Sequence, residues 1–547
     1  MCRIMSLKSA RSFLAAIVLI ALFQAGLFAL EPPRPGEIEK YRSDGTLQQR
    51  IEFAKSLRNH KVSNNLAFRL DGRLNGEASM APPLGWQGMP TTGNVKILAI
   101  MIGFNDYPPN TDTELVYGRM FGDGPGTFPY ESLRNFYFRS SYGLLEFSGD
   151  ALGWYVTPYP RSSVQESTTG RESLIKEVLN HYDEMGHDFS QYDNDGDGTI
   201  DYLVVIWTGP DNGWANFWWG YMTSFQDSSF KLDGKRLGGY SWQWESNPEG
   251  GKFSARVVIH ETGHALGLPD YYDYDDWTGP SGGVGGLDQM DGNWGDHNCF
   301  SKMLLEWLTP QVVTTGFSSP VLSPTSEAPE ALLVMPEAKA GEQFAEYYMI
   351  QYRRTTENDV VYPNDGLIVW HVDARTDTGG YDFLYDNSYS SHKLLRLMEA
   401  DGLEEIEQNK WADGGDFYTE GYSIGPQTAP SSSRYSSLPS GIQMDSITEA
   451  GDTIGCSLSL PSSAVTLTSV QKLKNPFRLV VSGTGIQEGA KAVIGTDSAY
   501  WPTASFQNGS ITLEKGKKLK KKFRIGSTVK IMVVNPDGSA GTITYKR

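Results

Sequence analysis

Two histidines four residues apart give this sequence its clearest chemical signal. On a helix, His260 and His264 project from one face, where both can ligate one metal ion. Gly267 permits a sharp turn after the second histidine, and Asp270 follows three residues later as a third ligand. Glu261, beside the first ligand, is placed to take a proton from metal-bound water. The spacing H-E-x-x-H-x-x-G-x-x-D therefore predicts a zinc site with one position left open for water and substrate.

Two alternatives compete with this interpretation. The five-residue pattern could occur by chance on a surface helix, or the site could bind metal without catalysing a reaction. The apolar lead-in at 257–259, with Gly267 and Asp270 in register after the histidines, favours a catalytic site. No Walker loop occurs in the sequence, so nothing in it indicates a P-loop phosphate site.

The metal motif and the residues after it resemble a known family. HETGHALGLPDYYD, at 260–273, is similar to the immune inhibitor A-type secreted zinc metallopeptidases, which belong with the metzincins. GGLDQMDGNWG, at 285–295, matches the methionine turn of that family, with Met290 as a hydrophobic base under the metal. The resemblance implies a metzincin-like α/β (α+β) peptidase domain in which Asp270 stands where most metzincins have a third histidine.

Further stretches extend the resemblance over residues 95–420. SKMLLEWLTP, at 301–310, is similar to a stretch of the family in which a glycine usually stands at the position of Glu306. The other similar stretches are 133–155, 366–373 and 397–402. The resemblance implies a secreted zinc endopeptidase that cleaves extracellular proteins or peptides, with Glu261 as general base.

Two other functions remain open at this stage. One is a non-catalytic secreted or surface adhesion protein that keeps the metal-binding fold as a scaffold. The intact Glu261 argues against it, because a pure binder needs no general base. The other is a metallohydrolase that acts on a different bond, because zinc-hydroxide chemistry is not specific to peptides.

An acidic loop lies upstream of the metal motif, in YDNDGDGTIDYLVVIW at 192–207. Its spacing, D-x-D-x-D-G-x-x-D, matches positions 1, 3, 5 and 9 of a calcium loop, although Val204 stands where an EF-hand has its bidentate glutamate. The oxygen donors would be Asp193, Asp195, Asp197 and Asp201, with the backbone carbonyl of Thr199. We predict a single structural calcium loop; a solvated acidic turn is the alternative. The family often carries such a loop.

The N-terminal residues predict export from the cell. Residues 1–29 combine Arg3, Lys8 and Arg11 with a following apolar run, as a signal peptide does; a retained membrane anchor is the alternative. No later stretch is long and apolar enough to span a membrane. The formal net charge of −18 over 547 residues argues against nucleic acid as a partner.

Residues 30–92 predict a pro-segment that is separate from the core and is removed, with cleavage near the Pro/Gly-rich passage 80–94. One helical stretch is expected within it, at 47–57. A secreted protease needs restraint before export, and the segment contains no cysteine to cap the zinc. A carboxylate such as Asp71 could cap it instead.

The remaining chain predicts a multi-domain protein. From 93 to 310, the expected catalytic domain alternates strands with helices. Its expected elements are strands at 95–104 and 201–209, helices at 132–141, 172–185 and 255–268, and a strand hairpin at 144–159. Short strand patterns then predict a β-rich module at 311–460 and an immunoglobulin-like sandwich, weakly similar to IPT/TIG domains, at 461–547.

The remaining predictions concern the basic C-terminal residues, the two cysteines and the other histidines. The last 87 residues hold 14 Lys and Arg against 4 Asp and Glu, which indicates either a solvated face or contact with a polyanionic cell surface or matrix. After signal removal, Cys299 and Cys456 could pair or stay free. We expect ordinary surface or core roles for the histidines without ligand partners at suitable spacing, which are His60, His181, His187, His371 and His392.

Overall fold

The fold is taken from a computed structural model of the chain. It describes residues 36–61, 89–124, 126–245, 252–274, 283–376, 382–388, 392–408, 410–462, 464–474, 476–497 and 499–547. The predictions for residues 1–29 and for Asp71 lie outside these ranges. Among the helices of the described residues, none has both the length and the apolar character needed to cross a membrane. Cys299 and Cys456 are both buried and are not bridged.

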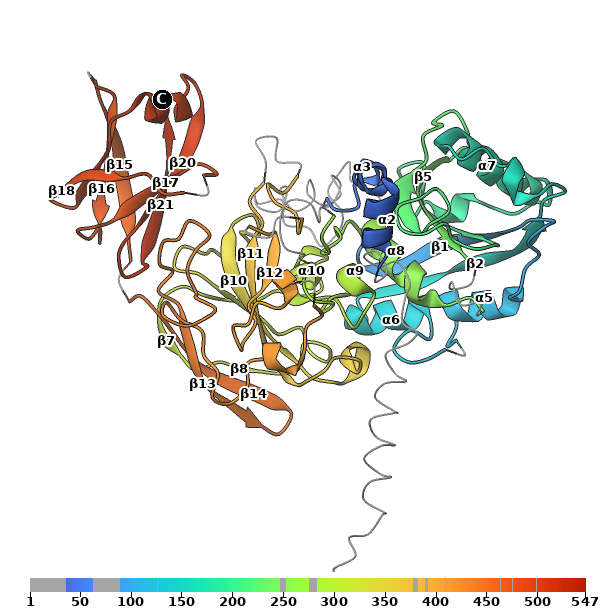
Figure 1. The fold of residues 1–547 in the computed structure, drawn as a ribbon, viewed down its shortest axis with the longest axis horizontal. Coiled ribbons are helices and arrows are strands. Elements are labelled where there is room, and N and C mark those ends of the chain that lie inside the picture. Colours follow the sequence, from blue (N-terminus) through green and yellow to red (C-terminus); the bar gives the residue numbers. More distant parts are fainter. Residues whose placement is uncertain are drawn as a thin grey trace, which may run out of the picture.

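A five-stranded sheet forms the centre of the first unit, which we call the α/β unit (Figure 1). The strand order is β2-β1-β3-β5-β4, with β4 alone antiparallel at one edge. The strands are β1 (Gly93–Gly103), β2 (Leu145–Val156), β3 (Thr199–Trp207), β4 (Tyr221–Ser224) and β5 (Arg236–Trp244). The predicted strands at 95–104 and 201–209 are therefore confirmed as β1 and β3. The predicted hairpin at 144–159 is wrong: β2 is one long strand that pairs in parallel with β1.

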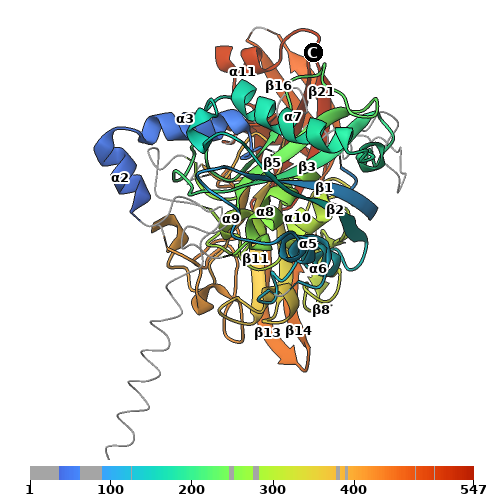
Figure 2. The ribbon, with the colours of Figure 1, turned by 90° about the vertical axis from the view of Figure 1, so that its right-hand side faces the viewer.

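Helices cover both faces of this sheet (Figure 2). They are α5 (Thr113–Phe121), α6 (Leu133–Ser140), α7 (Thr168–Glu184) and α8 (Ala255–Leu266). Two short helices follow, α9 (Gln289–Gly292) against α8 and α10 (Cys299–Leu304) against β10 (Glu346–Arg353) of the next unit. Side chains of a strand point alternately to its two faces. In β1, Ile97 and Met101 accordingly join the core under α5, α6 and α8, whereas Leu98 and Ile100 join the core under α7. The apolar runs of the central strands are thus explained by burial on both sides.

The next unit is rich in strands and contains two sheets. One has the order β12-β11-β10-β9-β6, and the other joins β13, β14 and β7, with β8 also paired to β14. Their bounds are β6 (Gln311–Val313), β7 (Gly316–Ser318), β8 (Val321–Leu322), β9 (Leu332–Val334), β10 (Glu346–Arg353), β11 (Gly366–Asp373), β12 (Leu395–Leu397), β13 (Gln443–Ala450) and β14 (Thr453–Leu460). One continuous core holds Ile259 and Met290 of the α/β unit together with Tyr347 and Trp370 of this β-rich unit.

The C-terminal unit has a core of its own, which includes Val481, Ile511 and Ile531. Its antiparallel sheets have the orders β15-β16-β19-β18 and β17-β20-β21. The elements are β15 (Thr466–Leu473), β16 (Arg478–Thr484), β17 (Lys491–Ile494), β18 (Thr503–Gln507), β19 (Ser510–Leu513), α11 (Lys517–Lys522), β20 (Thr528–Val534) and β21 (Ala540–Lys546). The chain is therefore multi-domain and mixed α/β, while the immunoglobulin-like assignment stays a prediction.

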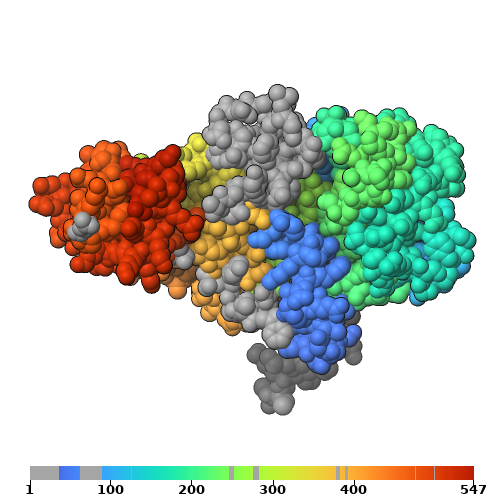
Figure 3. Space-filling model, turned by 90° about the horizontal axis from the view of Figure 1, so that it is seen from above, coloured from blue at the N-terminus to red at the C-terminus, as the bar shows by residue number. Residues whose placement is uncertain are grey.

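The N-terminal segment packs against the α/β unit. Helices α2 (Glu37–Asp44) and α3 (Leu47–Leu57) form here, and α3 matches the helix expected at 47–57. Tyr41, Leu47 and Ile51 are buried in the same core as α7. The expectation that residues 30–92 stand apart from the core is thus wrong for α2 and α3, because their apolar residues find partners on the α/β unit. Figure 3 shows residues 36–61 (blue) on the surface between the α/β unit (green) and the β-rich unit (gold).

Candidate metal centre

Helix α8 brings the two histidines and the glutamate together. It begins after Ser254, whose hydroxyl accepts a hydrogen bond from the Arg256 N–H, and ends at Gly267 in the left-handed conformation, with φ of 111°. A side chain at φ > 0 is strained, so glycine suits this position. The chain then returns so that one ligand atom each of His260, His264 and Asp270 lies within 4.8 Å of the others. The structure therefore assembles all three predicted zinc ligands.

Hydrogen bonds fix which nitrogen of each histidine faces the centre. His260 Nδ1 lies 3.0 Å from the carbonyl oxygen of Gln289, and His264 Nδ1 lies 2.8 Å from that of Leu268. A carbonyl oxygen only accepts, so each Nδ1 carries the proton of its neutral ring and each Nε2 presents a lone pair. Such a partner on the far ring nitrogen is the usual support of a metal-ligating histidine.

The three ligand atoms face one another as acceptors. Asp270 Oδ1 lies 2.9 Å from His260 Nε2 and 3.3 Å from His264 Nε2. Asp270 Oδ1 and His264 Nε2 are buried and have no hydrogen-bond partner in the described part of the chain. Lone pairs held this close in a buried site repel one another unless a cation or a proton lies between them. The donor set therefore fits a zinc ion, for which imidazole and carboxylate ligands are usual.

Asp270 is held in its charged form. Burial alone would raise the pKa of this carboxyl group, but positive charge at the two neighbouring Nε2 atoms, supplied by protonated His264 and His260 when no metal ion is there, holds its pKa well below its ordinary value. Its other oxygen, Oδ2, accepts a hydrogen bond from the Tyr274 hydroxyl at 2.5 Å. The sequence analysis did not predict this role for Tyr274; the one available signal was its position four residues after Asp270.

Glu261 lies beside the ligands without joining them. It is fully buried, and neither of its carboxylate oxygens accepts a hydrogen bond of normal geometry from the described residues. Burial raises the pKa of Glu261 to about 8, while the nearby His260 lowers it. A buried carboxylate without fixed partners is free to exchange a proton with a water beside the metal.

Met290 lies under α8, as the resemblance implies. Its side chain is fully buried, and a Cβ built on Gly263 would come within 2.3 Å of its sulfur. The absence of a side chain at 263 thus lets the methionine pack against the helix between the two histidines. The sequence indicated Met290, but not its dependence on Gly263.

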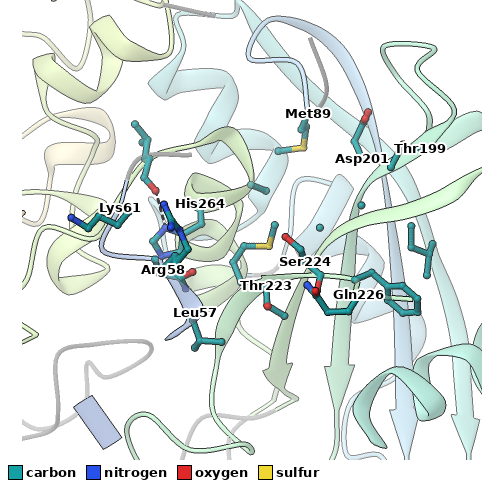
Figure 4. A pocket seen from close by; sticks show the side chains of 18 of the residues that line it. Leu57, Arg58, Lys61, Met89, Thr199, Asp201, Thr223, Ser224, Gln226 and His264 are labelled. Atoms are coloured by element: carbon teal, nitrogen blue, oxygen red, sulfur yellow. Dashed lines mark hydrogen bonds between the residues drawn. The ribbon is translucent and has the colours of Figure 1, made fainter. Parts of the chain in front are cut away.

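A pocket leads from the metal centre along the edge strand β4. Its volume is about 590 Å³, and its lining includes His264, Thr223 and Ser224. Figure 4 shows Arg58 and Lys61 of the N-terminal segment near His264, with Asp201 on the far side. An unpaired strand edge beside a pocket offers backbone groups to an extended peptide.

The N-terminal segment covers the metal centre itself. Ala54, Leu57 and Asn59 line a small cavity together with all three ligands, and the carbonyl oxygen of Asn59 accepts a hydrogen bond of 2.7 Å from the Asp270 N–H. The cavity volume is about 20 Å³, which is room for about one water molecule. Nothing in the sequence around Asn59 indicated this contact, which joins residues more than two hundred positions apart.

The acidic loop forms a second cluster of carboxylates. Oxygens of Asp193, Asp195, Asp197 and Asp201 lie within 4.8 Å of one another. Thr199 begins β3 directly after the loop, and its N–H donates to Asp197 Oδ1. The loop is fastened to β1 by Asn194, whose side chain bonds to both backbone groups of Lys96. The structure therefore assembles the four predicted carboxylates at the sheet.

Charge in this loop is only partly compensated. Lys235 Nζ lies 2.6 Å from Asp193 Oδ2, and side-chain contact with this lysine helps to lower the pKa of Asp193 against the effect of burial. Burial raises the pKa of Asp201 to about 7, with a further increase from Asp195 and Asp197. Asp193 Oδ1 and Asp201 Oδ1 are buried without hydrogen-bond partners in the described residues. The cluster is compatible with a bound cation.

Other acidic and histidine residues gather elsewhere. Carboxylates also cluster in two overlapping sets in the β-rich unit, Glu399/Asp401/Asp416 and Asp401/Glu405/Asp413, whose members are spread along the sequence without a metal-loop spacing. His371 stacks between two tyrosines and contacts Glu346, and His392 contacts Asp373, as ordinary core or surface residues do. His60 is different, because its ring lies against Tyr274 at 5.1 Å between centroids.

Comparisons with known proteins give distant, partial matches. No protein-family model matches the chain. Over 265 residues it is 24% identical to "Immune inhibitor A" of Bacillus thuringiensis subsp. alesti, a match that covers 38% of this chain and 37% of that protein. Over 232 residues it is 26% identical to "Pre-pro-metalloprotease PrtV" of Vibrio cholerae, covering 32% of this chain and 25% of that protein.

The matches therefore span little more than a third of the curated relatives' length at most. Among solved structures, that of wild-type OgpA from Akkermansia muciniphila covers 84% of this chain and 94% of that chain, with 10% sequence identity. Its TM-score of 0.20 is too low to carry a conclusion about the fold. The chain is thus distantly similar to metalloproteases over about a third of its length, and a metal cofactor agrees with that similarity.

Proposed function

We propose that the protein is a secreted zinc-dependent endopeptidase that hydrolyses peptide bonds of extracellular proteins. The observation that carries the proposal is the acceptor-to-acceptor packing of His260, His264 and Asp270, with the unpartnered Glu261 beside it. The partial matches to metalloproteases support the same reaction class. The printed name "Pre-pro-metalloprotease" of one relative agrees with a precursor that is processed.

The chain's own residues divide the work of hydrolysis. Zinc held by such ligands polarises a carbonyl and lowers the pKa of bound water to about 7. Glu261 takes one proton from the attacking water on its carboxylate and delivers it to the leaving nitrogen. The carbon–nitrogen bond breaks, the acyl carbon keeps the hydroxyl group of the water in a new carboxyl group, and the nitrogen leaves as a neutral amine that carries the transferred proton. Edge strand β4 orients the peptide beside the centre.

Digestion of casein by the purified secreted protein tests the proposal. We expect peptide release that stops when a chelator removes the metal and returns when zinc is restored. Metal analysis of the same sample should find one zinc per chain at the catalytic centre. A protein that binds zinc but digests neither casein nor peptides would instead support the adhesion scaffold, because that function needs no proton transfer.

The acidic loop gives the first expected result on stability. We propose that Asp193, Asp195, Asp197 and Asp201, with the Thr199 carbonyl, bind calcium and so fasten β3 to β1. A ligand that binds only the folded state stabilises it by mass action, so removal of calcium with zinc retained should lower the melting temperature. Thermal unfolding with and without calcium, at constant zinc, measures this effect.

A double variant provides the control for the loop. Asp195→Asn/Asp197→Asn should melt at the temperature of the calcium-free wild type and should no longer respond to calcium. Asp183→Asn, on the exposed end of α7, should respond as the wild type does. If the double variant still gains stability from calcium, the ion binds elsewhere and this assignment is wrong.

The N-terminal segment gives the second expected result. We propose that residues 30–92 keep the enzyme latent until they are removed near 80–94. Support comes from α3, whose residues close the metal cavity. Ile51 of α3 is buried against the α/β unit, so Ile51→Asp places an unpaired charge there and should release the helix. The unprocessed chain should then cleave a short fluorogenic peptide at least about ten times faster, since access to the site limits the rate.

Gln48→Asp is the matched control, because Gln48 lies on the exposed side of the same helix. It should leave the full chain latent. N-terminal sequencing of the active secreted form should show a start after α3. An unprocessed wild-type chain that is as active as the processed one would contradict the proposed latency.

A further inference from the structure

Basic residues follow α3 at the point where the N-terminal segment crosses the metal centre. Directly after α3, the backbone of Asn59 bonds to Asp270, and the neighbouring residues are Arg58, His60 and Lys61. Arg58 Nη2 lies 3.0 Å from Asp382 Oδ2. The side chains of Arg58, His60 and Lys61 all approach the stretch 382–388 of the β-rich unit.

Asp386 receives two of these side chains. Lys61 Nζ lies 3.8 Å and His60 Nε2 4.0 Å from Asp386 Oδ2. Burial lowers the pKa of His60 to about 4, so its ring lies beside the carboxylate as a neutral group. In the described part of the chain, Lys61 is therefore the one cationic partner of Asp386, and it belongs to the N-terminal segment. Its distance is that of a loose ion pair, so a better placed ammonium or guanidinium group could come closer.

Asp386 is held at a fixed position beside the metal centre. It is 7% exposed, and its Oδ1 accepts a hydrogen bond of 2.9 Å from the Ser388 N–H. The next residue, Asn387, donates to the carbonyl oxygen of Tyr271, and the Ser388 hydroxyl accepts from the Tyr274 N–H. The carboxylate is thereby tied to the same short stretch that carries Asp270 and its hydrogen-bonding tyrosine.

A carboxylate this deeply buried is costly without a cation. Removal of the N-terminal segment takes away Lys61, its one cationic partner among the described residues, and leaves the charge beside the stretch that carries Asp270. We propose that Asp386, together with Asp382, the partner of Arg58, forms a subsite that binds a lysine or arginine side chain of the substrate close to the scissile bond. The segment occupies this subsite in the latent chain as a substrate would. The inference rests on the proposed peptidase function.

Matched peptides test the subsite. Quenched fluorescent peptides carry lysine, glutamine or glutamate at one position at a time around the cleavage point. They are offered to the full chain with α3 released by Ile51→Asp, and to the same chain after N-terminal processing. At one position, kcat/KM for lysine should exceed that for glutamine by about tenfold, the worth of one charge-assisted hydrogen bond. The ratio should fall as salt is added.

Asp386→Asn should bring the lysine-to-glutamine ratio close to one, mainly through a higher KM for the lysine peptide. Asp183→Asn, on the far end of α7, should keep the wild-type ratio. Equal cleavage of lysine and glutamine peptides at every position, or an unchanged ratio in Asp386→Asn, overturns the subsite.

A binding measurement separates this proposal from the peptidase proposal. Glu261→Gln in the same chain is titrated with the fluorescent lysine and glutamine peptides. The subsite is supported if Glu261→Gln binds the lysine peptide more tightly than the glutamine peptide and the double variant Glu261→Gln/Asp386→Asn does not. This holds even if the wild type cleaves nothing, in which case only the proposed reaction is wrong. Equal affinities overturn the subsite even if casein is digested.

Discussion

Glu261→Gln should abolish peptide hydrolysis while zinc stays bound. Glutamine is close in shape to glutamate but cannot accept a proton at neutral pH, so the attacking water loses its base. General-base catalysis is worth about 10²- to 10⁴-fold, and the loss in kcat should fall in that range. Glu261 makes no contact that holds the ligands, since its oxygens have no hydrogen-bond partners in the described residues. Hydrolysis of a fluorogenic peptide and zinc content, measured on one sample, check both halves of the result.

Glu184→Gln is the matched control, because Glu184 lies on the exposed end of α7. It should keep both zinc and activity. Near-normal hydrolysis by Glu261→Gln would rule out the general-base role, whereas loss of zinc would mean that Glu261 acts in metal binding instead.

Asp270→Ala should lose zinc and activity together. The substitution removes the only charged ligand of the predicted set and leaves two imidazoles, too few for a stable zinc site, which usually has three protein ligands. It also leaves the Tyr274 hydroxyl without the acceptor it has here. Zinc affinity by competition with a coloured chelator should fall by at least about tenfold, as losses around metal sites do.

Asp273→Ala is the discriminating control, since Asp273 is another acid in the same turn. It should keep zinc and activity, because Asp270 and not Asp273 meets the two histidines. We also expect Asp270→His to retain zinc, since imidazole is a suitable third ligand. The reverse pattern, with zinc lost in Asp273→Ala and kept in Asp270→Ala, would require a different ligand set.

Local rules made the metal centre predictable. Helical periodicity places His260 and His264 on one face of α8, and Gly267 ends the helix in the conformation that glycine favours. Asp270 then needs only three residues to return to the same face. The acidic loop was predictable for the same reason, because its four carboxylates lie within nine residues of one another.

Long-range contacts were not predictable from the sequence. The alternating pattern around Gly149 fits a hairpin locally, and only the parallel pairing of β2 with β1 makes one long strand of it. The pairing of Lys61 with Asp386 joins residues more than three hundred positions apart. Such pairings depend on how separate elements pack, which a single sequence does not specify. The N-terminal segment is polar overall, so the sequence predicted that it lies apart from the core, although a few of its apolar residues pack against the α/β unit.

The packing of Met290 against Gly263 limits which residues can stand inside the metal motif. At the second variable position of H-E-x-x-H, the methyl group of an alanine would come within 2.3 Å of the methionine sulfur, so the fully buried Met290 would have to shift. The two positions, 27 residues apart, are therefore expected to change together during evolution. A relative with a bulkier residue between its histidines should carry a smaller residue in its methionine turn, so that the helix and the turn still pack at the same separation.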